Sequence, residues 1–233
     1  MGLESPSVRF EMWRRLLCIS AYAVAMGLFE AACVVYLRRL VAPAGFAADG
    51  FPTQLARFPI ELVREACTMV MLATVAYVAA FDWRSRVTSF FFMFGIWDIL
   101  YYVGLKWFAD WPSAWLQWDC LFLIPKPWHG PVLAPILIST YFIFAHLLLL
   151  ARERSNSTFR FSGPTILLQL LAFLVWYWSF VKHSDRIAAH GYSAVGYSWL
   201  LFACGLIIGL LGLWLATRPE RTPPPVPSEE SGP

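Results

Sequence analysis

Residues 16–37 read LLCISAYAVAMGLFEAACVVYL, an apolar run of 22 residues in which Glu30 is the one charged side chain. A helix needs about 20 apolar residues to cross roughly 30 Å of hydrocarbon, so the run predicts a membrane-spanning helix. The apolar core of a secretory signal peptide is shorter, about 7–15 residues, and no small-residue cleavage site followed by a soluble domain comes after this run. We therefore expect the segment to remain in the protein as its first span.

Five more apolar runs of similar length follow, at residues 60–81, 87–108, 130–150, 163–182 and 194–216. Of the 233 residues, 59% are hydrophobic and 14% charged, whereas soluble domains carry about 25% charged residues. The sequence thus predicts an all-α polytopic membrane protein, a bundle of about six transmembrane helices over residues 16–216. A cytoplasmic segment, residues 1–15, precedes the bundle, and a disordered Pro-rich tail, residues 217–233, follows it.

A shorter apolar stretch, residues 120–128, lies between the third and fourth spans and contains Pro125 and Pro127. Nine residues are too few to cross the bilayer as a helix. We expect a short interfacial or re-entrant segment here. If the stretch did span, the count would be seven and the C-terminal tail would change sides.

Four tryptophans just before this stretch follow a helical spacing. Trp107, Trp111, Trp115 and Trp118 lie at offsets of 4, 8 and 11, which places them on one helix face. Pro112 suits the first turn of such a helix. The pattern predicts a short interfacial helix, with carbohydrate or quinone stacking on the indole rings as the alternative.

The distribution of Lys and Arg sets the orientation. With six spans, ten of these residues fall on the side of the two termini and eight on the other. The connections at 82–86 and 152–160 are compact and carry arginines, which is typical of cytoplasmic turns. We expect both termini in the cytoplasm of a bacterial cell, with the protein in its inner membrane.

Asp98 lies near the middle of the third span, in FGIWDILYY at residues 94–102. A charged group in hydrocarbon costs about 2.5–3.5 kcal/mol on insertion scales, so such a residue marks a candidate functional site. Tyr101 and Tyr102 lie three and four residues further on, where a phenol could hydrogen-bond to the carboxylate. Asp98 is therefore either a proton or cation site or a carboxyl with a structural hydrogen bond.

A second acidic group opens the second span, where Glu61, Arg64 and Glu65 share one helix face. Two carboxylates beside an arginine can bind a divalent cation, or they can form a self-neutralising ion-pair cluster at the membrane edge. Glu30, two-thirds of the way through the first span, is expected in the same half of the membrane.

Histidines and further acids gather in the connections predicted to lie outside. His129 precedes the fourth span, and the last outer connection contains His183, Asp185 and His190. Together these four residues could supply zinc ligands or a general base, although no HxxxH or HExxH spacing supports a metal. Asp119 is expected on the same outer side. His146, in the inner half of the fourth span, is expected to be a packing residue, with axial haem ligation as a minor alternative.

The polar residues thus predict a basin that opens outward, with Asp98 as its floor. Its candidate residues are Glu30, Glu61, Arg64, Glu65, Asp98, Tyr101, Asp119, His129, His183, Asp185 and His190. The cofactor is unknown, and a divalent metal is one possibility.

Small residues in the last span predict close helix packing. Gly205, Gly209 and Gly212 form GxxxGxxG, a spacing that lets helix backbones approach closely. We expect the glycines to pack inside the chain, with a homo-oligomer or a partner in a membrane complex as the alternative. The five cysteines form no CxxC pair and are expected to be buried apolar residues rather than disulfides.

The sequence lacks the motifs of several common functions. The chain has no Walker A loop or GxGxxG for nucleotides, no GxSxG serine elbow, and no basic patch for nucleic acid. The segments at 94–102 and 111–135, the second reading WPSAWLQWDCLFLIPKPWHGPVLAP, with Arg64-Glu-Ala upstream, resemble a group of uncharacterised bacterial multi-pass membrane proteins. That resemblance implies a bacterial inner membrane and no activity.

Three functions fit these observations. The first is a membrane protein of unknown reaction whose outward acidic and histidine basin binds a metal or protons. The second is an accessory subunit of a larger membrane complex. The third is a small proton- or cation-coupled transporter.

Overall fold

The computed structural model describes residues 6–41, 59–154 and 161–218. Its described part contains six helices long and apolar enough to cross a membrane. They are α1 (Pro6–Val41), α3 (Pro59–Ala79), α4 (Trp83–Ala109), α5 (Leu133–Arg154), α6 (Gly163–Val181) and α8 (Trp199–Ala216). The predicted all-α polytopic bundle is confirmed. The predicted disordered tail lies almost wholly outside the described residues.

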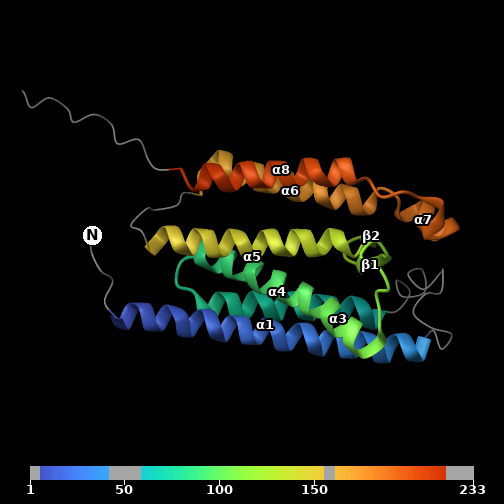
Figure 1. Cartoon of the computed structure of the whole chain (residues 1–233), viewed down its shortest axis with the longest axis horizontal. Coiled ribbons are helices and arrows are strands. Elements are labelled where there is room, and N and C mark those ends of the chain that lie inside the picture. Colours follow the sequence, from blue (N-terminus) through green and yellow to red (C-terminus); the bar gives the residue numbers. More distant parts are fainter. Residues whose placement is uncertain (1–5, 42–58, 155–160, 219–233) are drawn as a thin grey trace, which may run out of the picture.

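The long helices form two groups that lie side by side (Figure 1). α4 packs along α1 and against α3 and α5, while α6 packs along α8. The beginning of α1 and the end of α8 lie at one end of the bundle. Many apolar side chains face outward, among them Val78 and Leu200, which are 78% and 81% exposed. Lipid contact makes such a surface favourable, whereas water would not.

Small residues set the close approach of α1 and α4. A Cβ atom added at Gly27 would lie 2.5 Å from the carbonyl oxygen of Trp97, and one added at Gly104 would lie 2.6 Å from the Cβ of Ala31. Larger side chains at these positions would force the two helices apart. The backbone of α4 therefore lies directly against that of α1, which brings Asp98 and Glu30 into one half of the molecule.

The connection between α4 and α5 is a β-hairpin. Strand β1 (Trp118–Phe122) pairs antiparallel with β2 (Trp128–Pro131), and Cys120 lies opposite His129. The hairpin covers the end of the bundle away from the N-terminus (Figure 1). We call this the hairpin end. Residues 120–128 therefore form no spanning helix, and within the described residues the six-span count is confirmed over the seven-span alternative.

The predicted tryptophan helix is wrong. α4 ends at Ala109 because Asp110 adopts the left-handed conformation, with φ of 52°. The amides of Val132 and Leu133 then donate to the carbonyls of Gln117 and Trp115, so this backbone is tied to the start of α5 rather than to a helix of its own. Trp111 is 5% exposed and Trp115 is 65% exposed, so the tryptophans do not share one environment.

The last connection, between α6 and α8, also lies at the hairpin end. It contains the short helix α7 (Ser184–His190) and the 3₁₀ turn η1 (Tyr192–Ala194). The sixth span accordingly begins at Trp199 rather than at the predicted residue 194. The turn between α3 and α4 is capped, because the Asp82 carboxylate accepts from the amides of Arg84 and Ser85 at the start of α4.

The three glycines of α8 pack inside the chain. Gly205 lies against the indole of Trp176, Gly209 against Tyr141, and Gly212 against Gln169. The Gln169 amide and the Tyr141 hydroxyl both donate to the Gly209 carbonyl, each at 2.9 Å. The contacts of Trp176 and Gln169 explain why α6 and α8 form a close pair, and those of Tyr141 join α8 to α5.

Candidate polar site at the hairpin end

A buried ion pair joins the hairpin to α1. Arg38, in the last turn of α1, lies with Nη2 3.0 Å from Oδ1 of Asp119 in β1, and their side chains are 4% and 6% exposed. The Tyr102 hydroxyl of α4 donates to the other carboxylate oxygen at 3.3 Å. The Arg38 guanidinium also lies over the Trp111 ring, 4.7 Å from its centroid. Burial raises the pKa of the Asp119 carboxyl, and the positive charge of Arg38 opposes that rise.

A second ion-pair group joins α1 to α3. Arg64 pairs with Glu61, with Nη2 2.9 Å from Oε2, and also with Glu30 of α1. Thr68 and Trp97 donate to the second oxygen of Glu30, at 2.8 and 3.1 Å. The geometry is that of the ion-pair cluster rather than of the divalent-cation alternative, because the arginine occupies oxygens that a metal would need. Within the described residues, no three His, Cys, Asp or Glu side chains gather as metal ligands.

Glu65 has a different role from its neighbours on α3. Its two carboxylate oxygens accept from the backbone amide of Leu123, at 2.9 and 3.2 Å. Leu123 directly follows β1, so Glu65 holds the hairpin against α3. The residue is 5% exposed.

Asp98 lies deeper in the bundle, 8% exposed. Its Oδ2 accepts from the Ser139 hydroxyl of α5 at 2.8 Å. The predicted hydrogen bond from a tyrosine of its own helix is wrong: Tyr102 donates to Asp119 instead, and Tyr101 stacks on Trp97. Asp98 thus has a hydroxyl partner and, among the described residues, no cationic one.

His129 is separate from the buried acids. It is 3% exposed in β2, and its Nδ1 lies 3.3 Å from the Tyr192 hydroxyl. Burial lowers the pKa of its imidazole to about 4, so the ring is neutral at physiological pH. The neutral imidazole is packed at the hairpin end of the bundle.

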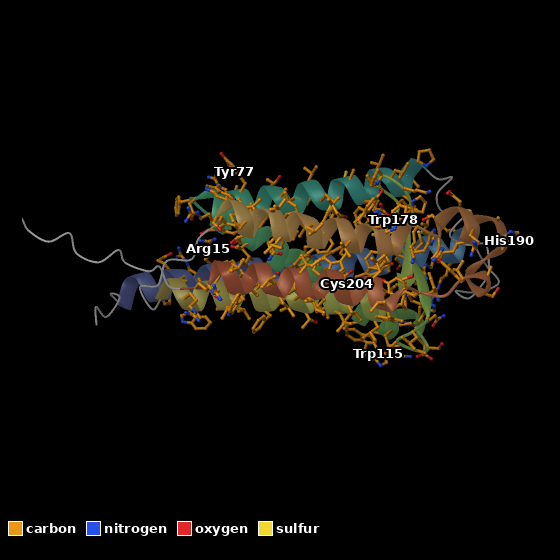
Figure 2. The ribbon with its side chains drawn as sticks, turned by 90° about the horizontal axis from the view of Figure 1, so that it is seen from above. Arg15, Tyr77, Trp115, Trp178, His190 and Cys204 are labelled. Atoms are coloured by element: carbon orange, nitrogen blue, oxygen red, sulfur yellow. The ribbon has the colours of Figure 1, made fainter. Side chains whose placement is uncertain are left out.

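The remaining members of the predicted basin lie on the surface of the hairpin end. Asp185 is exposed and pairs with Lys126 at 3.0 Å, and His190 projects outward on α7 (Figure 2). His183 is half-buried at the start of α7. The structure therefore brings together Glu30, Glu61, Arg64 and Glu65, places Asp119 and Asp98 nearby, and leaves the three loop residues apart.

His146 lies in α5 and packs on Phe92, with ring centroids 4.6 Å apart. Its neighbour Arg15 marks the opposite end of the bundle in Figure 2. The other three histidines lie at the hairpin end, so a second histidine ligand for haem is not at hand. The interpretation of His146 as a packing residue stays a prediction.

Arg38 and Ser139 are the site residues that sequence reasoning missed. In the sequence Arg38 is only one of the eight cations on the outer side, and it directly follows the apolar run 16–37. Ser139 gave no signal, because a serine in an apolar helix is common and its partner is 41 residues away. The chain matches no protein-family model, no curated protein and no solved structure.

The Arg38–Asp119 pair yields a stability prediction. Arg38→Met leaves a buried carboxylate without its counter-charge, and removing one partner of a buried pair costs about 3–5 kcal/mol. We expect a clear fall in the thermal unfolding temperature of the purified protein in detergent. Arg39→Met is the matched control, because Arg39 is exposed on the same helical turn.

The double variant Arg38→Met/Asp119→Leu should regain part of the lost stability, since neither member of the pair is then left buried without its partner. Equal unfolding temperatures for Arg38→Met and Arg39→Met would contradict the role given to the pair.

Proposed function

We propose that the chain is a small proton-translocating membrane protein, a channel or carrier, in which Asp98 is the proton site. The observation that carries this proposal is an imbalance of charge inside the hairpin half of the bundle. The buried carboxyls of the described residues there are Glu30, Glu61, Glu65, Asp98 and Asp119. The guanidinium groups paired with them are those of Arg38 and Arg64.

Five ionised carboxylates against two guanidinium ions would leave three uncompensated negative charges in a low-dielectric interior. Burying even one unpaired charge costs several kcal/mol, and such groups take up a proton instead. At rest, therefore, some carboxyls of this site carry a proton. A group of carboxyls that share protons in a membrane is typical of proton relays.

Asp98 is the carboxyl best placed to exchange its proton. Asp119, Glu30 and Glu61 each face a guanidinium, and Glu65 accepts a backbone hydrogen bond. Asp98 has, among the described residues, the Ser139 hydroxyl alone. It also follows Trp97, whose indole donates to Glu30, so α4 connects the deep carboxyl with the ion-pair group nearer the hairpin end.

We further propose that the hairpin end faces outward and that both termini are cytoplasmic, in a bacterial inner membrane. Compact arginine-bearing turns at the opposite end support this orientation: Arg84 and Arg86 begin α4 directly after a three-residue connection. The resemblance of residues 94–102 and 111–135 to bacterial multi-pass proteins supports the location.

The orientation is tested by cysteine labelling in whole cells. In a background with all five native cysteines replaced by alanine, Ser193→Cys at the hairpin end should react with a membrane-impermeant maleimide. Phe81→Cys, 97% exposed at the other end, should react only after the cells are opened. The reverse pattern would overturn the orientation, and equal labelling from outside would overturn the six-span topology.

Proton translocation is tested in liposomes. We expect the reconstituted protein to dissipate an imposed pH gradient faster than protein-free liposomes, and Asp98→Asn to remove that gain because the amide cannot release a proton. Asp185→Asn is the matched control, since Asp185 is exposed on α7, and it should behave as the wild type. A wild-type rate equal to that of protein-free liposomes, or a normal rate for Asp98→Asn, would refute the proposal.

A further inference from the structure

A cavity of about 360 Å³ lies beside Asp98, between the two helix groups. α4 and α5 form one wall, α6 forms the other, and the hairpin closes one end. Figure 1 shows α6 and α8 as a separate layer next to α5. The volume is within the range of about 300–1,000 Å³ that small-molecule sites occupy.

The lining of this cavity is aromatic with a single polar spot. Six of the aromatic side chains come from four different elements: Phe94, Trp97, Trp128, Phe142, Phe173 and Trp176. Asp98 and Ser139 are the lining residues with a carboxyl or hydroxyl group, and no Lys or Arg is among the lining residues that the structure describes. The Asp98 carboxyl and the Ser139 hydroxyl thus face a cavity lined by aromatic rings.

Two features of this lining select the charge of a ligand. The face of an aromatic ring is electron-rich and attracts cations, by about 2 kcal/mol or more when water is excluded. The Asp98 carboxylate, once its proton has left, needs a counter-charge that no neighbouring side chain in the described part of the chain provides. An organic cation satisfies both demands, whereas an anion would be repelled and a neutral molecule would leave the carboxylate uncompensated.

The surroundings of the cavity select an apolar body for that cation. Phe91 and Phe173, on two of the membrane-spanning helices, line the cavity and are 36% and 45% exposed, so this side of the cavity borders an apolar surface. A second cavity of about 430 Å³ continues along the seam between α5 and α6 and shares the walls formed by Phe142 and Trp176. A ligand with its charge at Asp98 has room there for alkyl or aryl groups.

We propose that this cavity binds a lipophilic organic cation, with the positive centre at Asp98 and the apolar groups along the α5–α6 seam. The inference rests on the proposed function in one respect, the exchangeable proton of Asp98: the cation takes the place of that proton. It adds the chemical class of a ligand, which proton translocation alone does not define.

Binding is measured by equilibrium dialysis of the full chain in a neutral detergent. The probes are tetraphenylphosphonium and tetraphenylborate, which have nearly the same shape and opposite charge. We expect saturable binding of tetraphenylphosphonium and none of tetraphenylborate beyond its partition into detergent. Equal binding of the two ions would overturn the proposal, because the cavity would then not select a cation.

Variants of Asp98 test whether the cation binds at this residue. Asp98→Asn keeps a group that can hydrogen-bond to Ser139 but loses the charge, so the affinity for tetraphenylphosphonium should fall by about tenfold or more. Asp98→Glu should keep most of the binding, and Asp185→Asn should leave it unchanged. Thermal unfolding of each variant shows whether it is folded.

The outcomes separate this inference from the proposed function. Dialysis uses no pH gradient, and the liposome assay uses no organic cation. Unchanged tetraphenylphosphonium binding in folded Asp98→Asn would overturn the ligand proposal and leave proton translocation standing. Binding of uncharged triphenylphosphine oxide as tightly as the cation would also overturn it, since the cavity would then be a site for neutral apolar molecules such as lipid chains.

Discussion

The ion pair between Arg38 and Asp119 holds together three parts of the chain that are far apart in sequence: the end of α1, the strand β1 and, through Tyr102, helix α4. In a membrane protein the hydrophobic effect does little to press helices together, because lipid chains are as apolar as the side chains. Polar contacts that cannot be replaced by water therefore decide where the hairpin lies. Glu65, through the amide of Leu123, fixes the same hairpin from α3.

These polar contacts bury carboxyl groups, and the free energy of burying their charge is the basis of the proposed function. Each carboxyl that anchors the hairpin half must be compensated, and two guanidinium groups are not enough for five acids. Asp98, bound to a hydroxyl, is a carboxyl with neither a guanidinium partner nor a backbone amide among the described residues. It is also the one that lines the aromatic cavity. In both of our proposals this lack of a counter-ion is the reason for choosing Asp98, as the proton site and as the partner of a lipophilic cation.

The sequence predicts the spans well because their signal is length and apolar content, which bilayer thickness imposes on each helix separately. The buried acids could also be identified from the sequence as candidate site residues, because any ionisable group inside a span is costly. The hydrogen-bond and ion-pair partners of these acids could not be predicted. Asp98 and Ser139, or Arg38 and Asp119, are 41 and 81 residues apart, and spacing along one helix says nothing about them. The tryptophan pattern failed because a spacing of 4, 4 and 3 fits a helix, but Asp110 ends α4 before it can continue.

Infrared difference spectroscopy tests most directly whether Asp98 carries the proton, because a protonated carboxyl and a carboxylate have separate stretching bands. Spectra of the purified protein are recorded between neutral and alkaline pH, for the wild type and for Asp98→Asn. We expect a protonated-carboxyl band in the wild type at neutral pH that decreases on alkalinisation and is weakened or lost in the variant. An identical band in both proteins, or none in the wild type, would contradict the assignment of the proton to Asp98.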